Sequence, residues 1–395
     1  MAVFPLELIE NILAHAYAEY QPLKKPLVLH QCALVCVEWR DIAQSFIFSE
    51  ILLSADIPDE KLDIFRDNSR LPQYVRTLYL SCNRGLDGGE QFLPLLPNVR
   101  QLCVLNYGIV SALLRGPTAE RFMGNLTSLC LEGAATPFWA GVFYLCHSLR
   151  ELEMTDAEFD FDETQDLAKD RPISRLRSLG IAGDRESHME ILQWMLKPQS
   201  PFDLTGLTTF RTSNCLDCSE EFEPYSWIQQ IIKLCASSLR DLEVRPPTTL
   251  ALQNPDLTSG SLLYPSTLCN LRVFTISIMQ ETTGDVKLMN YIPWMKTFFS
   301  LLPNSNRLEE IYISCTFMDY TNYDRVDEKI GFYDWEALDT MLTSSHFNLR
   351  RVVLDIDRSG SGGLVISAPL LREFLPGLTE KGILEIKFPT RLGFV

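Results

Sequence analysis

One six-residue pattern recurs along this chain: an apolar residue, two others, an apolar residue, one other, and a final apolar residue. Eleven copies lie between residues 75 and 386, far more than an arbitrary sequence would contain, and the last is degenerate. They read VRTLYL (75–80), VRQLCV (99–104), LTSLCL (126–131), LRELEM (149–154), LRSLGI (176–181), LTTFRT (207–212), LRDLEV (239–244), LRVFTI (271–276), LEEIYI (308–313), LRRVVL (349–354) and KGILEI (381–386). The chain is therefore expected to repeat one structural unit.

The spacing within each copy predicts one short β-strand. Its last three positions place two apolar side chains on one face of an extended chain, and the first apolar residue closes the preceding turn. Amphipathic stretches with helical spacing separate several copies, at residues 191–196, 225–235, 294–302 and 335–342. This succession predicts an α/β fold, a right-handed solenoid with a curved parallel sheet inside and helices outside. A doubly wound α/β sheet is the alternative, disfavoured because its strands do not repeat one hexapeptide.

From about residue 73 to the C-terminus, the series resembles leucine-rich repeats. The asparagine or cysteine of that family, eight positions after the first apolar residue, is present only as Asn83 and Cys215. The period also grows, from 23–27 residues in the first copies to 31 or more after residue 176 and to 41 between Leu308 and Leu349. Long loops are therefore expected along one rim, at residues 247–266, 279–291 and 316–333.

The first fifty residues follow a different pattern, typical of short helices. Pro5 stands at a first helical position and opens an apolar stripe with the spacing of one helix face. Residues 21–26 break this helix, and a second helical stretch runs from about residue 27 to residue 46. A unit of this size cannot bury so many apolar side chains alone, so some must face the first repeat or another protein.

Over residues 3–54 this module resembles an F-box. The matching residues are Pro5-Leu6-Glu7-Leu8-Ile9, then Ile12 and Leu13, then Ala33-Leu34-Val35-Cys36 with Trp39, and finally Phe48, Ile51 and Leu52. The sequence departs from the motif at Phe4, where leucine is usual, and in an insert at 18–26. An F-box binds the Skp-type adaptor of a cullin-RING ubiquitin ligase. The residues that the resemblance implies for adaptor contact are Pro5, Leu6, Leu8, Ile9, Ile12, Leu34, Val35, Cys36 and Trp39.

These patterns predict a helical module at residues 1–54, a linker or repeat entry at 55–72, and a repeat solenoid of about eleven irregular repeats at 73–395. The resemblance implies a substrate-recognition subunit of an SCF-type ligase, with the target protein on the concave face or rim loops of the repeats. The alternative is a repeat scaffold without a link to ubiquitin, whose N-terminal helices only cap the solenoid, since repeat proteins need capped ends.

Side chains that flank the central strand residues are expected to point out of the sheet and to contact the target. Tyr and Arg are the most common energetic anchors of protein interfaces. The residues predicted for target binding are Tyr79, Glu153, Arg211, Glu243, Arg245, Tyr312 and Arg351.

Charge and composition exclude other partners. With 51 acidic and 35 basic residues the net charge is −16, which repels nucleic acid and anionic membranes. No apolar run reaches the roughly 20 residues of a membrane span, and the acidic N-terminus is unlike a signal peptide. The 11 scattered cysteines lack the spacing of a disulfide framework. A protein of the cytoplasm, the nucleus or both is expected.

The sequence holds no convincing catalytic or metal motif. Cys215 and Cys218 have CxxC spacing, but no second ligand pair exists to complete a zinc site. The glycine-rich 359–363 completes no phosphate-binding loop, and the acidic runs at 156–170 and 319–328 lack the order of a calcium loop. Motifs of serine, cysteine or zinc hydrolases are missing. We therefore expect a non-enzymatic protein that needs no cofactor and no metal.

Overall fold

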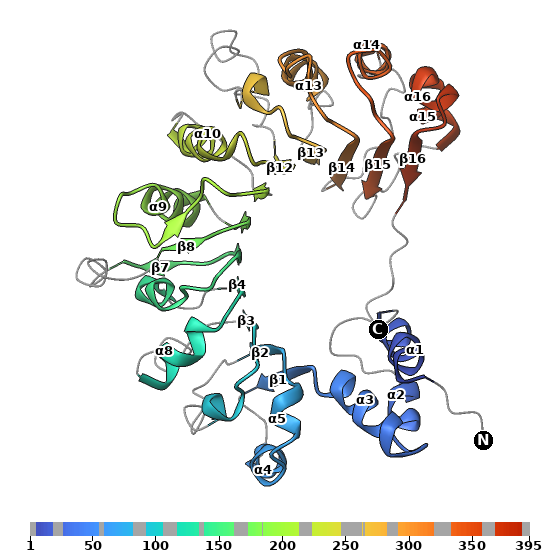
Figure 1. Cartoon of the computed structure of the whole chain (residues 1–395). Coiled ribbons are helices and arrows are strands. Elements are labelled where there is room, and N and C mark those ends of the chain that lie inside the picture. Colours follow the sequence, from blue (N-terminus) through green and yellow to red (C-terminus); the bar gives the residue numbers. More distant parts are fainter. Residues whose placement is uncertain are drawn as a thin grey trace. The chain divides into compact units, whose positions relative to one another are not determined.

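The computed structural model describes residues 5–18, 27–54, 59–81, 92–105, 117–133, 138–161, 173–183, 185–212, 223–245, 263, 265–282, 291–319, 333–357 and 368–388 (Figure 1). The chain divides into two compact units. The first holds residues 1–176 and 198–203, and the second holds residues 177–197 and 204–395. Both are mixed α/β structures built on parallel strands.

The first unit begins with three helices and continues into five parallel strands of the main sheet. The helices are α1 (Leu6–Ala18), α2 (Leu27–Cys32) and α3 (Val37–Ile47). The strands follow in the order β1 (Glu50–Ser54), β2 (Thr77–Ser81), β3 (Gln101–Leu105), β4 (Ser128–Glu132) and β6 (Glu151–Thr155). Connecting elements are α4 (Asp59–Asp67), α5 (Leu71–Tyr74), η1 (Leu93–Leu95), α8 (Pro117–Gly124) and η2 (Ala140–Leu145). Two short parallel pairs join β5 (Phe138–Trp139) to β7 (Phe159–Asp160) and β8 (Ser174–Arg175) to β10 (Phe202–Asp203).

The second unit alternates strand and helix more regularly. Its strands are β9 (Ser178–Ala182), β11 (Thr209–Thr212), β12 (Asp241–Val244), β13 (Val273–Thr282), β14 (Glu310–Asp319), β15 (Arg351–Asp357) and β16 (Leu384–Lys387), in that spatial order. The helices are α9 (Arg185–Met195), α10 (Glu223–Cys235), η4 (Pro265–Thr267), α13 (Tyr291–Ser300), α14 (Tyr333–Leu342), α15 (Ala368–Phe374) and α16 (Pro376–Glu380). The longer helices lie together on one side of the strands (Figure 1).

The register of the strands explains the repeated hexapeptide. In the first unit, Leu78, Leu102, Leu129 and Leu152 are aligned partners on successive strands, and each is at most 1% exposed. Burying a leucine side chain contributes about 1.5–3 kcal/mol, so a row of them stabilises each strand against its neighbour. The predicted strands are confirmed, because each of the eleven copies contains one.

Aromatic side chains fill the space between sheet and helices in the second unit. The ring of Phe274 on β13 stacks on Phe298 of α13, with centroids 4.4 Å apart, and packs edge-on against Phe299 at 5.4 Å. The ring of Trp294 also stacks on Phe298, with centroids 5.6 Å apart. These contacts hold α13 on one face of the strands, as the amphipathic pattern at 294–302 predicts.

Three features of the structure were not specified by the sequence-based predictions. β13 and β14 continue to Thr282 and Asp319, paired residue by residue, so the loops expected from 279 and from 316 begin later. β1 precedes the first hexapeptide and pairs with β2. The last residues of the predicted helical module are therefore a strand of the sheet. The segment 55–72 carries helices α4 and α5. Asn83, Cys215, Cys218 and residues 247–262 and 359–363 lie outside the described residues.

Replacing Phe274 with alanine should remove this aromatic contact and leave a cavity beneath α13. The expected loss is about 3–5 kcal/mol of the free energy of unfolding, measured by urea titration. Thr275→Ala is the matched control, because Thr275 is the next residue of β13 and faces the opposite side of the sheet; it should change stability by less than about 0.5 kcal/mol. Equal losses from both substitutions would contradict a core formed on one face of the strands.

Candidate interaction surfaces

The three N-terminal helices share a small core of their own. Ile9 and Leu13 of α1, Leu29 of α2, and Ala43 and Ile47 of α3 are buried together. Partly buried side chains complete this cluster: Tyr17, Cys32, Ala33, Trp39, Ile42, Phe46 and Phe48. Each helix is too short to be stable alone, so mutual packing holds the three together.

The three helices and the turn after α2 also carry exposed apolar side chains. Of the thirteen large apolar side chains exposed in the described residues, eight lie between Leu6 and Val37. The eight residues, with their exposed fractions, are Leu6 (54%), Leu8 (43%), Ile12 (46%), Leu27 (71%), Val28 (39%), Leu34 (81%), Val35 (65%) and Val37 (61%). We name these residues the apolar patch. Scattered exposed apolar residues are ordinary on a protein surface, but a concentration of this kind is typical of an interaction site.

Most of the residues predicted for adaptor contact are exposed. Pro5, Leu6, Leu8, Ile12, Leu34, Val35 and Cys36 are exposed, whereas Trp39 is half-buried against the helical core. Ile9 is only 4% exposed and packs within that core, so it holds α1 in place and has no surface to offer a partner. Leu27, Val28 and Val37 belong to the apolar patch although the sequence did not single them out. The sequence signal that could have found them is an apolar residue adjacent to another apolar residue that fills the core, as Val28 is to Leu29.

The helical core is joined to the first strand by a polar contact beside aromatic ones. The Tyr17 hydroxyl donates a hydrogen bond to the Glu50 carboxylate on β1, and the Ser49 hydroxyl lies 3.3 Å from the Tyr17 oxygen. Burial, followed by the hydrogen bond to Glu50, raises the pKa of Tyr17 to about 12. The rings of Phe48 and Phe65 pack edge-on with centroids 6.2 Å apart. The connection to the sheet therefore runs through residues outside the apolar patch.

On the free side of the strands of the first unit, one side chain per strand forms a row. The aligned residues are Leu52, Tyr79, Cys103, Cys130 and Glu153. Burial raises the pKa of Tyr79 to about 12. The thiols of Cys103 and Cys130 hydrogen-bond to each other, which lowers the pKa of Cys103 and raises that of Cys130. The predicted Tyr79 and Glu153 thus lie in one row, three strands apart.

The other predicted target-binding residues lie on or beside the strands of the second unit. Arg211, Glu243 and Tyr312 belong to one row of aligned residues, while Arg245 directly follows β12. The Glu243 carboxylate accepts a hydrogen bond of 3.3 Å from the Ser277 hydroxyl. Arg211 is exposed, and Arg245 is half-buried.

Arg351 is engaged within the protein. Its Nε and Nη2 donate to Glu385 at 2.8 and 2.5 Å, and its Nη1 donates to the Tyr312 hydroxyl at 3.0 Å. Tyr312 in turn donates to Glu310 at 2.6 Å. The hydrogen bond from Arg351 lowers the pKa of Glu385, and the one to Glu310 raises the pKa of Tyr312. Arg351 and Tyr312 are therefore less free to bind a partner than the sequence suggested.

No group of three or more His, Cys, Asp and Glu residues in the described part of the chain is placed to hold a metal. The described helices include none with the length and apolar character needed to cross a membrane.

Comparison with known proteins leaves the family of the chain open. The sequence matches no family model and no curated protein. Among solved structures, it is similar to a leucine-rich-repeat protein of Leptospira interrogans, with 12% sequence identity and a TM-score of 0.29. That match covers 86% of this chain and 100% of the other.

Removal of the Tyr17 hydroxyl should make the stability of the protein less dependent on pH above about pH 10. A raised pKa means that the folded state holds its proton more tightly, so stability present below about pH 10 is lost as the pH rises toward about 12. Near pH 8 we expect Tyr17→Phe to have a free energy of unfolding about 1 kcal/mol lower than that of the wild type, because one hydrogen bond is missing. Between pH 10 and 12 the free energy of unfolding of the variant should fall less than that of the wild type. Urea unfolding at several pH values measures both effects. Parallel pH curves for the two proteins would show that Tyr17 does not titrate as described.

Proposed function

We propose that this chain is the substrate-recognition subunit of an SCF-type ubiquitin ligase. In this proposal α1–α3 dock a Skp-type adaptor, and the repeat units bind the target protein. The chain itself is a non-catalytic subunit, and the rest of the cullin-RING assembly supplies the chemistry.

The observation that carries the proposal is the apolar patch. The residues that resemble an F-box include five of its members, Leu6, Leu8, Ile12, Leu34 and Val35, each at least 43% exposed. Covering such side chains on a partner gives about 25 cal/mol for each Å² of apolar surface removed from water. An F-box-like order of residues and an uncovered apolar surface are independent observations, and both favour docking.

The competing function is a scaffold whose helices only cap the repeats. A cap needs apolar side chains that face the first strands. Here the contacts to the sheet are made through Tyr17, Ser49, Phe48 and β1, and Leu8 and Val35 remain exposed. A cap alone therefore leaves the apolar patch without a purpose.

For the target, the free sides of the strands in both units offer polar and aromatic side chains. Tyr79 and Glu153 occupy one such row, and Arg211 and Glu243 another. Tyrosine and arginine are enriched among the residues that contribute most to protein interfaces. We propose a protein target on these rows.

Replacing Leu8 and Val35 together with aspartate should abolish adaptor capture. Losing each buried apolar anchor costs about 1–2 kcal/mol, so the double variant should bind at least about thirtyfold more weakly. The measurement is co-purification of the full chain with the Skp-type adaptor of the same cell, followed by titration of the purified components.

The matched control replaces Leu234 and Leu301 with aspartate. These two leucines are exposed to a similar extent, 47% and 42%, but lie in the second unit. The control should bind the adaptor like the wild type. The proposal would be refuted if the double variant still bound the adaptor, or if the folded wild type captured none. The scaffold function would then be the remaining interpretation.

A further inference from the structure

A row of arginines precedes the strands, at the second position of the hexapeptide. In the second unit the row consists of Arg177, Thr208, Arg240, Arg272, Glu309 and Arg350. Their backbones are joined in series, because each N–H donates to the carbonyl of the preceding member at 2.7–2.8 Å. Successive members therefore lie one strand spacing apart, about 4.8 Å.

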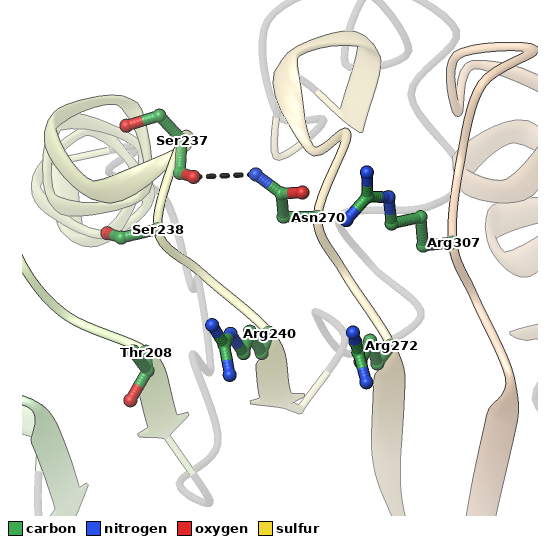
Figure 2. Close-up of a pocket in the computed structure, with 7 residues that line it drawn as sticks. All are labelled: Thr208, Ser237, Ser238, Arg240, Asn270, Arg272 and Arg307. Carbon is green, nitrogen blue, oxygen red and sulfur yellow. Dashed lines mark hydrogen bonds between the residues drawn. The ribbon is translucent and has the colours of Figure 1, made fainter.

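Around Arg240 and Arg272 this row borders a hollow of about 170 Å³ (Figure 2). Arg307 reaches it from the segment before β14, and Asn270 donates a hydrogen bond of 2.7 Å to the Ser237 carbonyl at its edge. Hydroxyl groups complete the lining. The seven lining residues are Thr208, Ser237, Ser238, Arg240, Asn270, Arg272 and Arg307. None of these seven is acidic and none is aromatic.

The guanidinium groups of Arg240, Arg272 and Arg307 form no ion pair and no hydrogen bond with any described residue. The carboxylates next to them in sequence are engaged elsewhere. Asp241 accepts a hydrogen bond of 3.1 Å from Thr209, and Glu309 lies 3.5 Å from Arg350. Three unpaired cations therefore share one small hollow in a chain whose net charge is −16.

Two arginines of the same row in the first unit, Arg76 and Arg100, behave differently. Arg76 donates to the carbonyl of Gln73 at 3.1 Å, and Arg100 donates to the carbonyls of Val99 and Asn125 at 3.4 Å. Those guanidinium groups are held by backbone, whereas the ones around the hollow are free to bind a ligand. Unpaired cations that line one hollow favour an anionic ligand.

We propose that this hollow binds the phosphate group of a phosphorylated serine or threonine on a partner protein. A guanidinium forms two parallel hydrogen bonds to phosphate oxygens, and adjacent arginines can share one dianion. A long polyanion such as RNA is disfavoured by the charge of the chain, and the lining offers no aromatic ring on which a base could stack. The inference is independent of adaptor docking, since α1–α3 take no part in it.

The test is calorimetric titration of the full chain, at low salt and pH 7.5, with a short capped peptide bearing one phosphoserine. We expect binding of the phosphopeptide and none of its unphosphorylated form. The double variant R240Q/R272Q should weaken binding at least about tenfold. The matched control R76Q/R100Q removes the same charge from the same row of the first unit and should stay within about twofold of the wild type. Both variants are checked for wild-type thermal unfolding first.

Several results would overturn the proposal. A phosphopeptide that does not bind, or an equal loss in the two double variants, would show that no specific site exists. Inorganic phosphate that binds as tightly as the peptide would assign the hollow to a free phosphate-type anion. A single-stranded oligonucleotide that binds more tightly, with the same dependence on Arg240 and Arg272, would assign it to nucleic acid.

Discussion

The alternation of side chains along aligned parallel strands is the constraint on which the rest of this structure depends. Because side chains point to opposite faces in turn, burying Leu242 or Phe274 under the helices leaves Glu243 and Thr275 on the free face. Because the strands pair in register, the residue aligned with a buried residue on the next strand faces the same side of the sheet. It also aligns the residue just before each strand, so Arg240 and Arg272 become neighbours although 32 residues separate them.

The N-terminal helices satisfy a different requirement. They bury side chains such as Leu13 and Leu29 in a shared core, while Leu34 and Val35 in the turn after α2 remain exposed. Their link to β1 is made by Tyr17, which packs against this core, and Glu50. The helices are therefore joined to the strands through residues outside the apolar patch, which stays exposed, as the proposed adaptor docking requires.

Much of the fold follows from local sequence, because each repeat consists of a strand with alternating apolar residues and, in several repeats, an amphipathic helix that covers one face of that strand. The strand positions and the helices at 191–196, 225–235, 294–302 and 335–342 are of this kind. The extension of β13 and β14 was missed because residues such as Thr282 and Asp319 gain a strand partner only when two repeats are aligned. Ile9 and Leu8 are adjacent apolar residues, and only the packing of α1 on α3 decides which is buried. The arginines share one position of the aligned hexapeptides, but only the packing shows which of them border a hollow and lack a protein partner among the described residues.

Hydrogen–deuterium exchange of the full chain, with and without the Skp-type adaptor, tests the central claim most directly. If the apolar patch is the docking surface, protection on adding adaptor should be confined to peptides covering residues 5–18 and 27–41. Protection over β2 and β3 instead, or no change in the first fifty residues at saturating adaptor, would contradict it.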